Sequence, residues 1–428
     1  MINFEKKVLS NGLRVILAPM SSTEAVTLLV LVKVGSRYET KNINGISHFL
    51  EHLFFKGTKK RPEPGQVLKD LNKIGADHNA FTSKEITGYW VKLSAKDFVI
   101  GLDVVSDILL ESLFKGEEIE KERGVIMREI DMIEDNPPRK IQSTLENVIF
   151  GDQPIGWNVA GDKEIVRKIK REDIIKYEAD NYLSQNMVVV VAGDLNKKTT
   201  FKKISDFFGK VRKGKNQPFK KTETLQTEPR AKILKKESDQ THFTLAFRAY
   251  DMFDKRRHAL NLLSVILGGN SSSRLFTEIR EKSGLAYYVY SWADQYEDCG
   301  YLGLAAGIPH EKLAEVAQKS IAIAKEIKEK GVSKDDLSFA KSFLRGQTAL
   351  KFEASDEIAS FVAGQELFYN KIIQPDEVLA KIEKVSQADI LKIAQDIFRP
   401  ERISMAVIGR QEQTKSNEEF YKKIFSKI

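Results

Sequence analysis

The chain repeats a pattern of residues at an interval of about half its length, and this repeat limits the folds that it can adopt. Residues 166–193 resemble residues 382–409 without a gap, at an offset of 216 positions. Near the start, residues 25–32 resemble residues 242–249 at an offset of 217 positions. A repeat this long predicts two tandem copies of one domain, because solenoids and propellers repeat at about 20–50 residues. The matched pairs are Asp173 with Asp389, Gly193 with Gly409 and Thr27 with Thr244.

A polar stretch separates the two copies. Residues 212–229 lack apolar periodicity and contain two prolines, which is typical of a linker. We therefore predict a first domain at 1–211 and a second at 230–428. Each copy mixes strand and helix patterns without strict alternation, from the hairpin signal Asn11-Gly12 onward. This mixture favours an α+β fold, in which each domain is a mostly antiparallel sheet with helices packed on one face.

Composition excludes several classes of protein. The 428 residues are 42% hydrophobic and 30% charged, as in globular proteins, and the single Cys299 excludes an intramolecular disulfide. The first residues lack the apolar core of a secretory signal, and the longest apolar runs are too short to cross a bilayer. We therefore expect a cytoplasmic protein that is not embedded in a membrane. The net charge of +8 is spread among 60 acidic residues without a recognition motif, so we expect no nucleic-acid partner.

The most specific chemical signal is the run His48-Phe49-Leu50-Glu51-His52. Positions four apart share one face of a helix, so His48 and His52 can offer two imidazoles to one metal ion. Glu51 lies beside that face and can take a proton from a metal-activated water. The alternative is a chance pairing of surface histidines, but the chain has only 6 histidines and this helix carries apolar neighbours. We therefore favour a metal site, and zinc suits its ligands.

A catalytic zinc needs a third protein ligand, and the residues alone leave its identity open. The predicted helix 117–134 offers Glu122 and Glu129, which are seven positions apart and thus on one face. One can bind the metal while the other forms a hydrogen bond to one of the metal ligands. Either can equally be a solvated glutamate. In the second copy, Val265 and Gly269 stand opposite the two histidines, so that copy cannot hold a metal in this way.

The pattern His48-x-x-Glu51-His52 is the inverted zinc motif of the inverzincin metallopeptidases, and the chain resembles their pitrilysin family, M16, over nearly its whole length. In that family the third ligand is a glutamate about 76 residues beyond the second histidine, and 76 residues lie between His52 and Glu129 here. The resemblance therefore implies one Zn²⁺ per chain, bound by His48, His52 and Glu129. The resemblance also makes Glu51 the general base. It aligns Glu122 with the family's second glutamate, which lies upstream on the same helix and belongs to the catalytic centre.

Two further segments carry the resemblance. Residues 75–89 are similar to the strand with which the family binds its substrate, where Asn79 and Ala80 present backbone to the peptide. Residues 272–287 are similar to the family's C-terminal segment, whose Arg and Tyr pair corresponds to Arg280 and Tyr287. The substrate-binding residues implied by the first segment are Asn79, Ala80, Phe81 and Thr82.

The resemblance implies a function as well as a fold. A protein of this kind is a zinc-dependent endopeptidase that hydrolyses extended or unfolded peptides. The length and the two-copy plan look like the branch that contains the mitochondrial processing peptidase and bacterial M16 peptidases. That branch works as a dimer, so we expect a homodimer or a heterodimer with a related subunit. The alternative is a non-catalytic or partner-dependent core-type subunit of such a heterodimer, although this chain keeps the motif residues.

Overall fold

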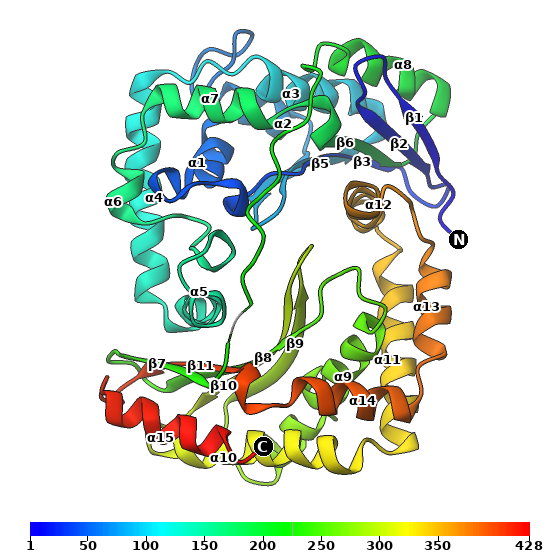
Figure 1. The fold of residues 1–428 in the computed structure, drawn as a ribbon. Coiled ribbons are helices and arrows are strands. Elements are labelled where there is room, and N and C mark those ends of the chain that lie inside the picture. Colours follow the sequence, from blue (N-terminus) through cyan, green and yellow to red (C-terminus); the bar gives the residue numbers. More distant parts are fainter. Residues whose placement is uncertain (225) are drawn as a thin grey trace. The chain divides into compact units, whose positions relative to one another are not determined.

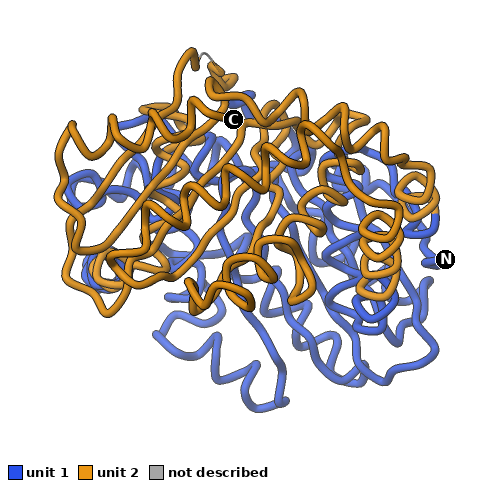
Figure 2. Tube along the Cα trace, turned by 90° about the horizontal axis from the view of Figure 1, so that it is seen from below, with its two compact units in different colours: residues 1–130, 157–220, 348–376 blue, residues 131–156, 221–347, 377–428 orange. Residues whose placement is uncertain are grey.

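The computed structural model describes residues 1–224 and 226–428, which form two compact units (Figure 1, Figure 2). Neither unit is a continuous stretch of chain, in contrast to the two predicted domains. Unit 1 consists of residues 1–130, 157–220 and 348–376. Unit 2 consists of residues 131–156, 221–347 and 377–428.

Unit 1 is built on a sheet with the strand order β1-β2-β6-β3-β5-β4 (Figure 1). Among the described residues, neighbouring strands of this sheet are antiparallel except β2 and β6, which are parallel. This arrangement confirms the prediction of a mostly antiparallel sheet, and it leaves β4 at one edge. The strands are β1 (Glu5–Val8), β2 (Arg14–Pro19), β3 (Ala25–Val32), β4 (Asp77–Thr82), β5 (Thr87–Ser94) and β6 (Met187–Gly193).

One face of this sheet packs against helices from the first half of the sequence. Alternate residues of β3, such as Val26, Leu28 and Val30, point into this core because side chains alternate along a strand. The helices on and around this face of the sheet bury their apolar side chains in the same core. They are α1 (Ile46–Leu53), α2 (Gln66–Lys73), α3 (Phe98–Leu110), α4 (Gly116–Asp135), α6 (Lys163–Val166), α7 (Arg171–Asn181) and α8 (Lys197–Phe208).

The opposite face of the same sheet is covered by α12 (Ser355–Tyr369), a helix from the second half of the sequence. Its buried residues Ala359 and Val362 pack against Leu29 and Val190 of the sheet. Polar contacts fix the helix along its length. The hydroxyls of Ser355 and Thr27 lie 2.8 Å apart, Lys92 Nζ lies 2.7 Å from Asp356, and Lys6 Nζ lies 2.7 Å from the fully buried Glu366.

Unit 2 repeats the plan with the strand order β7-β11-β8-β10-β9. One face packs against helices of the second half, and the other against α5 (Pro137–Phe150) from the first half, through Ile141, Leu145 and Ile149. The strands are β7 (Arg230–Lys235), β8 (Thr241–Ala249), β9 (Tyr288–Gln295), β10 (Gly300–Ile308) and β11 (Ile403–Gly409). The helices are α9 (Arg257–Gly268), α10 (Leu313–Lys330), α11 (Lys334–Lys351), α13 (Pro375–Glu383), α14 (Gln387–Ile397) and α15 (Lys415–Phe425).

The two halves of the sequence therefore exchange one helix each. The predicted boundaries follow the repeat and assign α5 to the first domain and α12 to the second, whereas the compact units assign them the other way. The physical reason is that both sheets are apolar on both faces: every residue of β6 and of β11 is buried. The α+β prediction is confirmed, and the second helical cover is an addition to it. In the predicted linker, 212–224 and 226–229 form neither helix nor strand.

The structure also refines the internal repeat. The helices α7 and α14, like the strands β6 and β11, begin 216 positions apart, as the sequence predicts. In the sheets, Ala192 lies opposite Thr27, and Ile408 lies opposite His242. With β6 and β11 aligned, Thr27 therefore corresponds to His242 and not to Thr244. The predicted offset of 217 is wrong by two residues, a shift that keeps every side chain on the same face of a strand.

Helices that could cross a membrane are absent from the described part of the chain, since none combines sufficient length with sufficient apolar character. The expected cytoplasmic location stays a prediction.

Candidate metal centre

Helix α1 presents three chemically active side chains on one side. Ile46, Phe49, Leu50 and Leu53 are buried in the core of unit 1, which turns the remaining face of this short helix outward from the core. That face carries His48, Glu51 and His52. The two imidazole rings lie 4.7 Å apart between centroids with an interplanar angle of 69°. The predicted sharing of one helix face by the two histidines is thus present.

Helix α4 brings Glu129 to the two histidines. Glu129 Oε2 lies 3.6 Å from Nε2 of His48 and 3.6 Å from Nε2 of His52. These separations are too long for hydrogen bonds, and they approach the separation of about 3.4 Å between two ligands of a tetrahedral zinc with bonds near 2.0–2.1 Å. Within the described residues, these three side chains are the group that meets the geometry of a metal site, with ligand atoms within 4.8 Å of one another.

Glu122 contacts a histidine from the side opposite to Glu129. Its Oε2 lies 3.1 Å from Nδ1 of His52, and its Oε1 lies 2.8 Å from Nζ of Lys56. A proton on Nδ1 donated to Glu122 leaves the lone pair of His52 on Nε2, which faces Glu129. Burial opposes the ionised form of Glu122, but its bonds to His52 and Lys56 prevail and lower the pKa of this carboxyl. Of the two candidate ligands, Glu129 thus faces both histidines and Glu122 supports His52.

The two histidines differ in their tendency to bind a proton. Burial, with a smaller contribution from His52, lowers the pKa of His48 to about 4, so this imidazole is neutral at pH 7. Burial also favours the neutral form of His52, but the carboxylates of Glu122, Glu51 and Glu129 outweigh it and raise the pKa of this residue. Neutral imidazole is the form that binds a metal ion.

Glu51 lies between the histidines and the edge strand. The hydroxyl of Thr82 donates a hydrogen bond to Glu51 Oε2 at 2.5 Å, which orients the carboxylate. Burial raises the pKa of Glu51, and Glu129 adds to this shift, while Thr82 and His52 oppose it. A partly buried carboxylate whose pKa lies above its usual value is suited to accept and return a proton.

The edge strand β4 offers backbone groups at positions that alternate along it. Ser83 N–H donates to Ile86 O across the hairpin, so the backbone groups of Phe81 and Asn79 also point toward β5. Those of Ala80 and Thr82 therefore point to the open edge. Of the predicted substrate residues, Ala80 and Thr82 have backbone groups at the open edge, whereas the backbone groups of Asn79 and Phe81 are directed toward β5. The role of all four residues in binding a peptide stays a prediction.

The side chain of Asn79 also contributes to this edge. Its side-chain Oδ1 accepts the Ala80 N–H at 2.9 Å, which satisfies this edge donor. The ring of Phe81 lies over Gly88 on the neighbouring strand, where a Cβ would come within 2.4 Å of it. Both side chains lie on the exposed face of the strand.

Arg280 and Tyr287 lie in unit 2, whereas the metal-site residues lie in unit 1. The Arg280 guanidinium sits over the ring of Phe276 at 4.9 Å. The Tyr287 side chain is 64% exposed, and its N–H donates to Gly307 O. A role for this pair in binding the peptide stays a prediction. Sequence reasoning missed Lys56, although it lies only four positions beyond His52, just after the end of α1.

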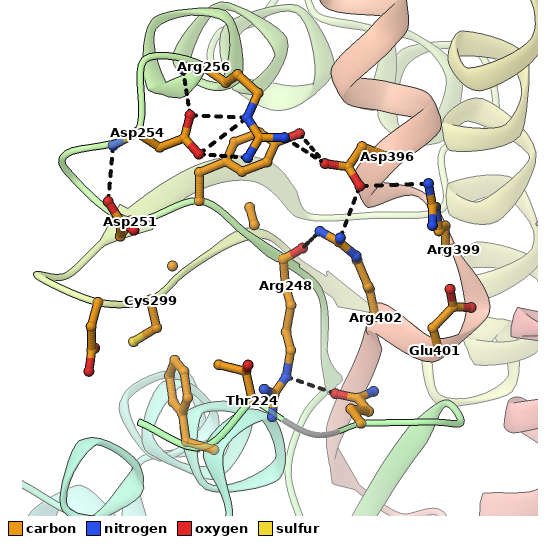
Figure 3. A pocket seen from close by; sticks show the side chains of 16 residues that line it. Thr224, Arg248, Asp251, Asp254, Arg256, Cys299, Asp396, Arg399, Glu401 and Arg402 are labelled. Carbon is orange, nitrogen blue, oxygen red and sulfur yellow. Dashed lines mark hydrogen bonds and ion pairs between the residues drawn. The ribbon is translucent and has the colours of Figure 1, made fainter. Parts of the chain in front are cut away.

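A separate polar cavity of about 660 Å³ occurs in unit 2 (Figure 3). Its charged groups satisfy one another to a large extent. Asp396 accepts hydrogen bonds from Tyr250, Arg256 and Arg402, and Asp254 pairs with Arg256 (Figure 3). The described residues that line this cavity lack the ligand pattern of a metal site, and the site on α1 remains the candidate centre.

Comparisons with known proteins identify the family of this chain. Residues 14–163 match the family described as Insulinase (Peptidase family M16), and residues 168–344 match the one described as Peptidase M16 inactive domain. An uncharacterized zinc protease of Streptomyces coelicolor is 32% identical over 410 residues, which cover 94% of this chain and 89% of that protein. An uncharacterized zinc protease of Bacillus subtilis is 32% identical over 400 residues, which cover 93% and 96%.

Solved structures share the fold. The crystal structure of a protease from Helicobacter pylori matches with a TM-score of 0.90 and 24% identity, covering 96% of this chain and 100% of that one. A peptidase M16 inactive domain from Pseudomonas fluorescens matches with a TM-score of 0.87 and 17% identity, covering 97% and 99%. The chain therefore has the same two-domain fold as these structures. The chain belongs to peptidase family M16, which confirms the family predicted from its motifs.

Proposed function

We propose that this chain is a zinc-dependent endopeptidase that hydrolyses extended or unfolded peptides. The observation that carries the proposal is the convergence of His48, His52 and Glu129 on one point, with Glu51 beside them. Two of the relatives are named zinc proteases, which supports zinc as the metal. The set of two imidazoles and one carboxylate is a common catalytic zinc site with a position left for water.

A zinc ion held by these three side chains would supply a Lewis acid that activates a water molecule and polarises a peptide carbonyl. Glu51 is the general base in this proposal. It accepts the proton of the attacking water on its carboxylate and passes it to the amine that leaves. Thr82 holds Glu51 in place, and Glu122 holds His52 with Nε2 toward the metal position. Each of these tasks is performed by residues of unit 1.

The edge strand supports an extended substrate. The outward C=O of Ala80 and the N–H and C=O of Thr82 can pair with a peptide that adds as one more strand beside β4, and the Ala80 N–H can join them when it leaves Asn79 Oδ1. Such pairing recognises the backbone groups of the peptide rather than its side chains. It therefore favours unfolded peptides of varied sequence. Because Thr82 also bonds to Glu51, a peptide at this edge lies close to the general base.

The proposal also includes residues of unit 2 and a second chain. Arg280 and Tyr287 contribute to binding the peptide, and the chain acts with a second M16-type chain, as a homodimer or a heterodimer. These parts are supported by the resemblance of residues 272–287 and of the whole chain to the family. Sedimentation of the purified chain, alone and with related subunits of its source, measures the association.

Removal and return of the metal tests the function. The purified chain should cleave an internally quenched, unstructured peptide, and chelation should abolish cleavage. One equivalent of Zn²⁺ per chain should restore it, because the site has one set of ligands. A chain that binds zinc but cuts no unstructured peptide, with or without partner chains, would support the alternative of a non-catalytic core-type subunit.

The pKa values of the two histidines give a second prediction. In the metal-free protein, His52 binds a proton below a pKa that lies above 6.5, whereas His48, with a pKa of about 4, stays neutral. Between pH 5 and 6, zinc therefore has to displace one imidazole proton, and log Kd should fall by about one per pH unit before it levels off. A competition titration with a chromophoric chelator measures this slope. A slope near two would mean that both imidazoles are protonated.

A further inference from the structure

Residues 35–39 contact both structural parts that meet at Glu51, and we call them the 35–39 segment. They lie between β3 and α1 in the sequence and form a short helical turn at Ser36–Tyr38. Their side chains at Arg37 and Glu39 are buried, with 1% and 3% exposed. Buried charged groups are costly unless they are paired, so their contacts define what the segment does.

Glu39 binds the beginning of the metal helix. Its Oε2 accepts hydrogen bonds from Gly45 N–H and from Asn44 Nδ2, both at 2.8 Å, and its Oε1 accepts one from Ser47 N–H at 2.8 Å. Helix α1 begins at Ile46 without a cap from its own N-terminal residue. The Glu39 carboxylate thus supplies the cap from a distance, at the end of the helix dipole that favours a negative charge. His48 follows one residue after this contact.

Arg37 binds the hairpin at the end of the edge strand. Its Nη1 lies 2.5 Å from Glu85 Oε1, and its backbone N–H donates to Lys84 O. Ser36 N–H donates to Ser83 O, directly after Thr82. The guanidinium also lies over the ring of Phe219 at 3.8 Å, which fixes its plane. The 35–39 segment is therefore joined to the hairpin by side chain and backbone alike.

Gly35 allows this close approach. A Cβ at this position would come within 2.3 Å of Ser83 O and 2.8 Å of Lys84 O, so any larger residue would push the hairpin away. The Thr82 to Glu51 hydrogen bond spans the two parts that the segment holds. The geometry of this hydrogen bond depends on the position of α1, which carries Glu51, and on the position of β4, which carries Thr82.

We propose that Glu39 and Arg37 are positioning residues, which together set the separation between the metal helix and the peptide-binding edge strand. The inference rests on the proposed function for the meaning of this separation. Arg37 and Glu85 contribute little net stability as a buried pair, because desolvation offsets their attraction. Their main effect is on geometry, and a displacement of about 1 Å between reacting groups can cost about 100-fold in rate.

Three glutamate-to-glutamine variants separate positioning from general stability. Glu39→Gln places an NH₂ group against the N–H donors of the helix start. Glu85→Gln removes the charge opposite Arg37. Glu366→Gln is the matched control, because Glu366 is fully buried, pairs with Lys6 and lies on α12. Burial raises the pKa of Glu39 to about 7, so measurements at pH 8 keep it ionised in the parent chain.

The expected results differ by variant. Glu39→Gln should raise the Kd for Zn²⁺ by about 10-fold and lower kcat by about 100-fold. Glu85→Gln should leave the zinc Kd unchanged and raise KM for an extended peptide by about 10-fold, since it moves the edge strand and not the metal helix. Glu366→Gln should lower the melting temperature without changing zinc Kd, kcat or KM. If Glu39→Gln fails to fold, Glu39→Asp, which keeps the charge at a shorter reach, gives the same comparison.

Two results would overturn the inference. One is a Glu39 variant with the zinc Kd of the parent chain. The other is equal effects of Glu39→Gln and Glu366→Gln on every constant. If the parent chain cleaves no peptide, the endopeptidase proposal fails by itself, whereas the zinc Kd and the binding of a fluorescent extended peptide still report on Glu39 and Glu85.

Discussion

Replacing Glu51 by glutamine should lower the cleavage of an extended peptide by about 1,000-fold or more, while the chain keeps its full zinc content. General-base catalysis contributes about 10²–10⁴-fold in enzymes, and an amide cannot accept the proton of the attacking water. The three predicted ligands, His48, His52 and Glu129, are unchanged in this variant. Kinetics on a quenched peptide and metal analysis of the same sample measure both quantities.

The control for this variant is Glu120→Gln on α4. Glu120 is 68% exposed and pairs with Arg123 on the helix surface, so its removal should change neither zinc content nor rate. Loss of zinc from Glu51→Gln would assign Glu51 to metal binding rather than to proton transfer. Full activity of this variant would remove Glu51 from the mechanism.

Residues 1–211 produced alone should fail to form a stable monomer. This fragment contains the sheet of unit 1 but lacks α12, so the face with Ile16, Leu29 and Val190 would be exposed to water. Burial of Ile358, Val362 and Leu367 at about 2 kcal/mol each contributes about 6 kcal/mol, comparable with the net stability of a whole domain. Size-exclusion chromatography and binding of a hydrophobic dye should report aggregates or a loosely packed state.

The same fragment should be rescued by the other half. Fragment 230–428 carries α12, and fragment 1–211 carries α5, so production of both in one cell should yield a complex in which each sheet is covered on both faces. A fragment 1–211 that is monomeric, cooperatively folding and free of dye binding would contradict the prediction. It would mean that the helices of its own half suffice for stability.

The metal cluster was predictable in part from spacing. Two histidines four positions apart share a helix face wherever the helix lies, so their convergence follows from the sequence alone. Glu122 and Glu129 are two turns apart on one face, and helical periodicity cannot separate them. The distinction depends on how α4 lies against α1, which is a tertiary property, and the resemblance to a family supplied it.

The direction of backbone groups at the edge strand was less predictable. Whether Asn79 or Ala80 faces outward depends on the register of the hairpin, and a shift of one residue reverses every position. The exchange of α5 and α12 was missed for a similar reason. Their apolar stripes indicate that each helix packs on something, but a stripe does not identify the sheet that it covers.

The exchanged helix α12 has a consequence for how the chain folds as it is synthesised. The last strand of the first sheet, β6, ends at Gly193, and the helix that covers its open face ends at Tyr369. At about 5–20 residues per second, the ribosome needs roughly 9–35 s to make the chain between these points. During that interval the nascent sheet exposes an apolar face with no cover of its own. Chaperones that bind nascent chains should therefore associate with this protein late in its translation, and release it once α12 has emerged.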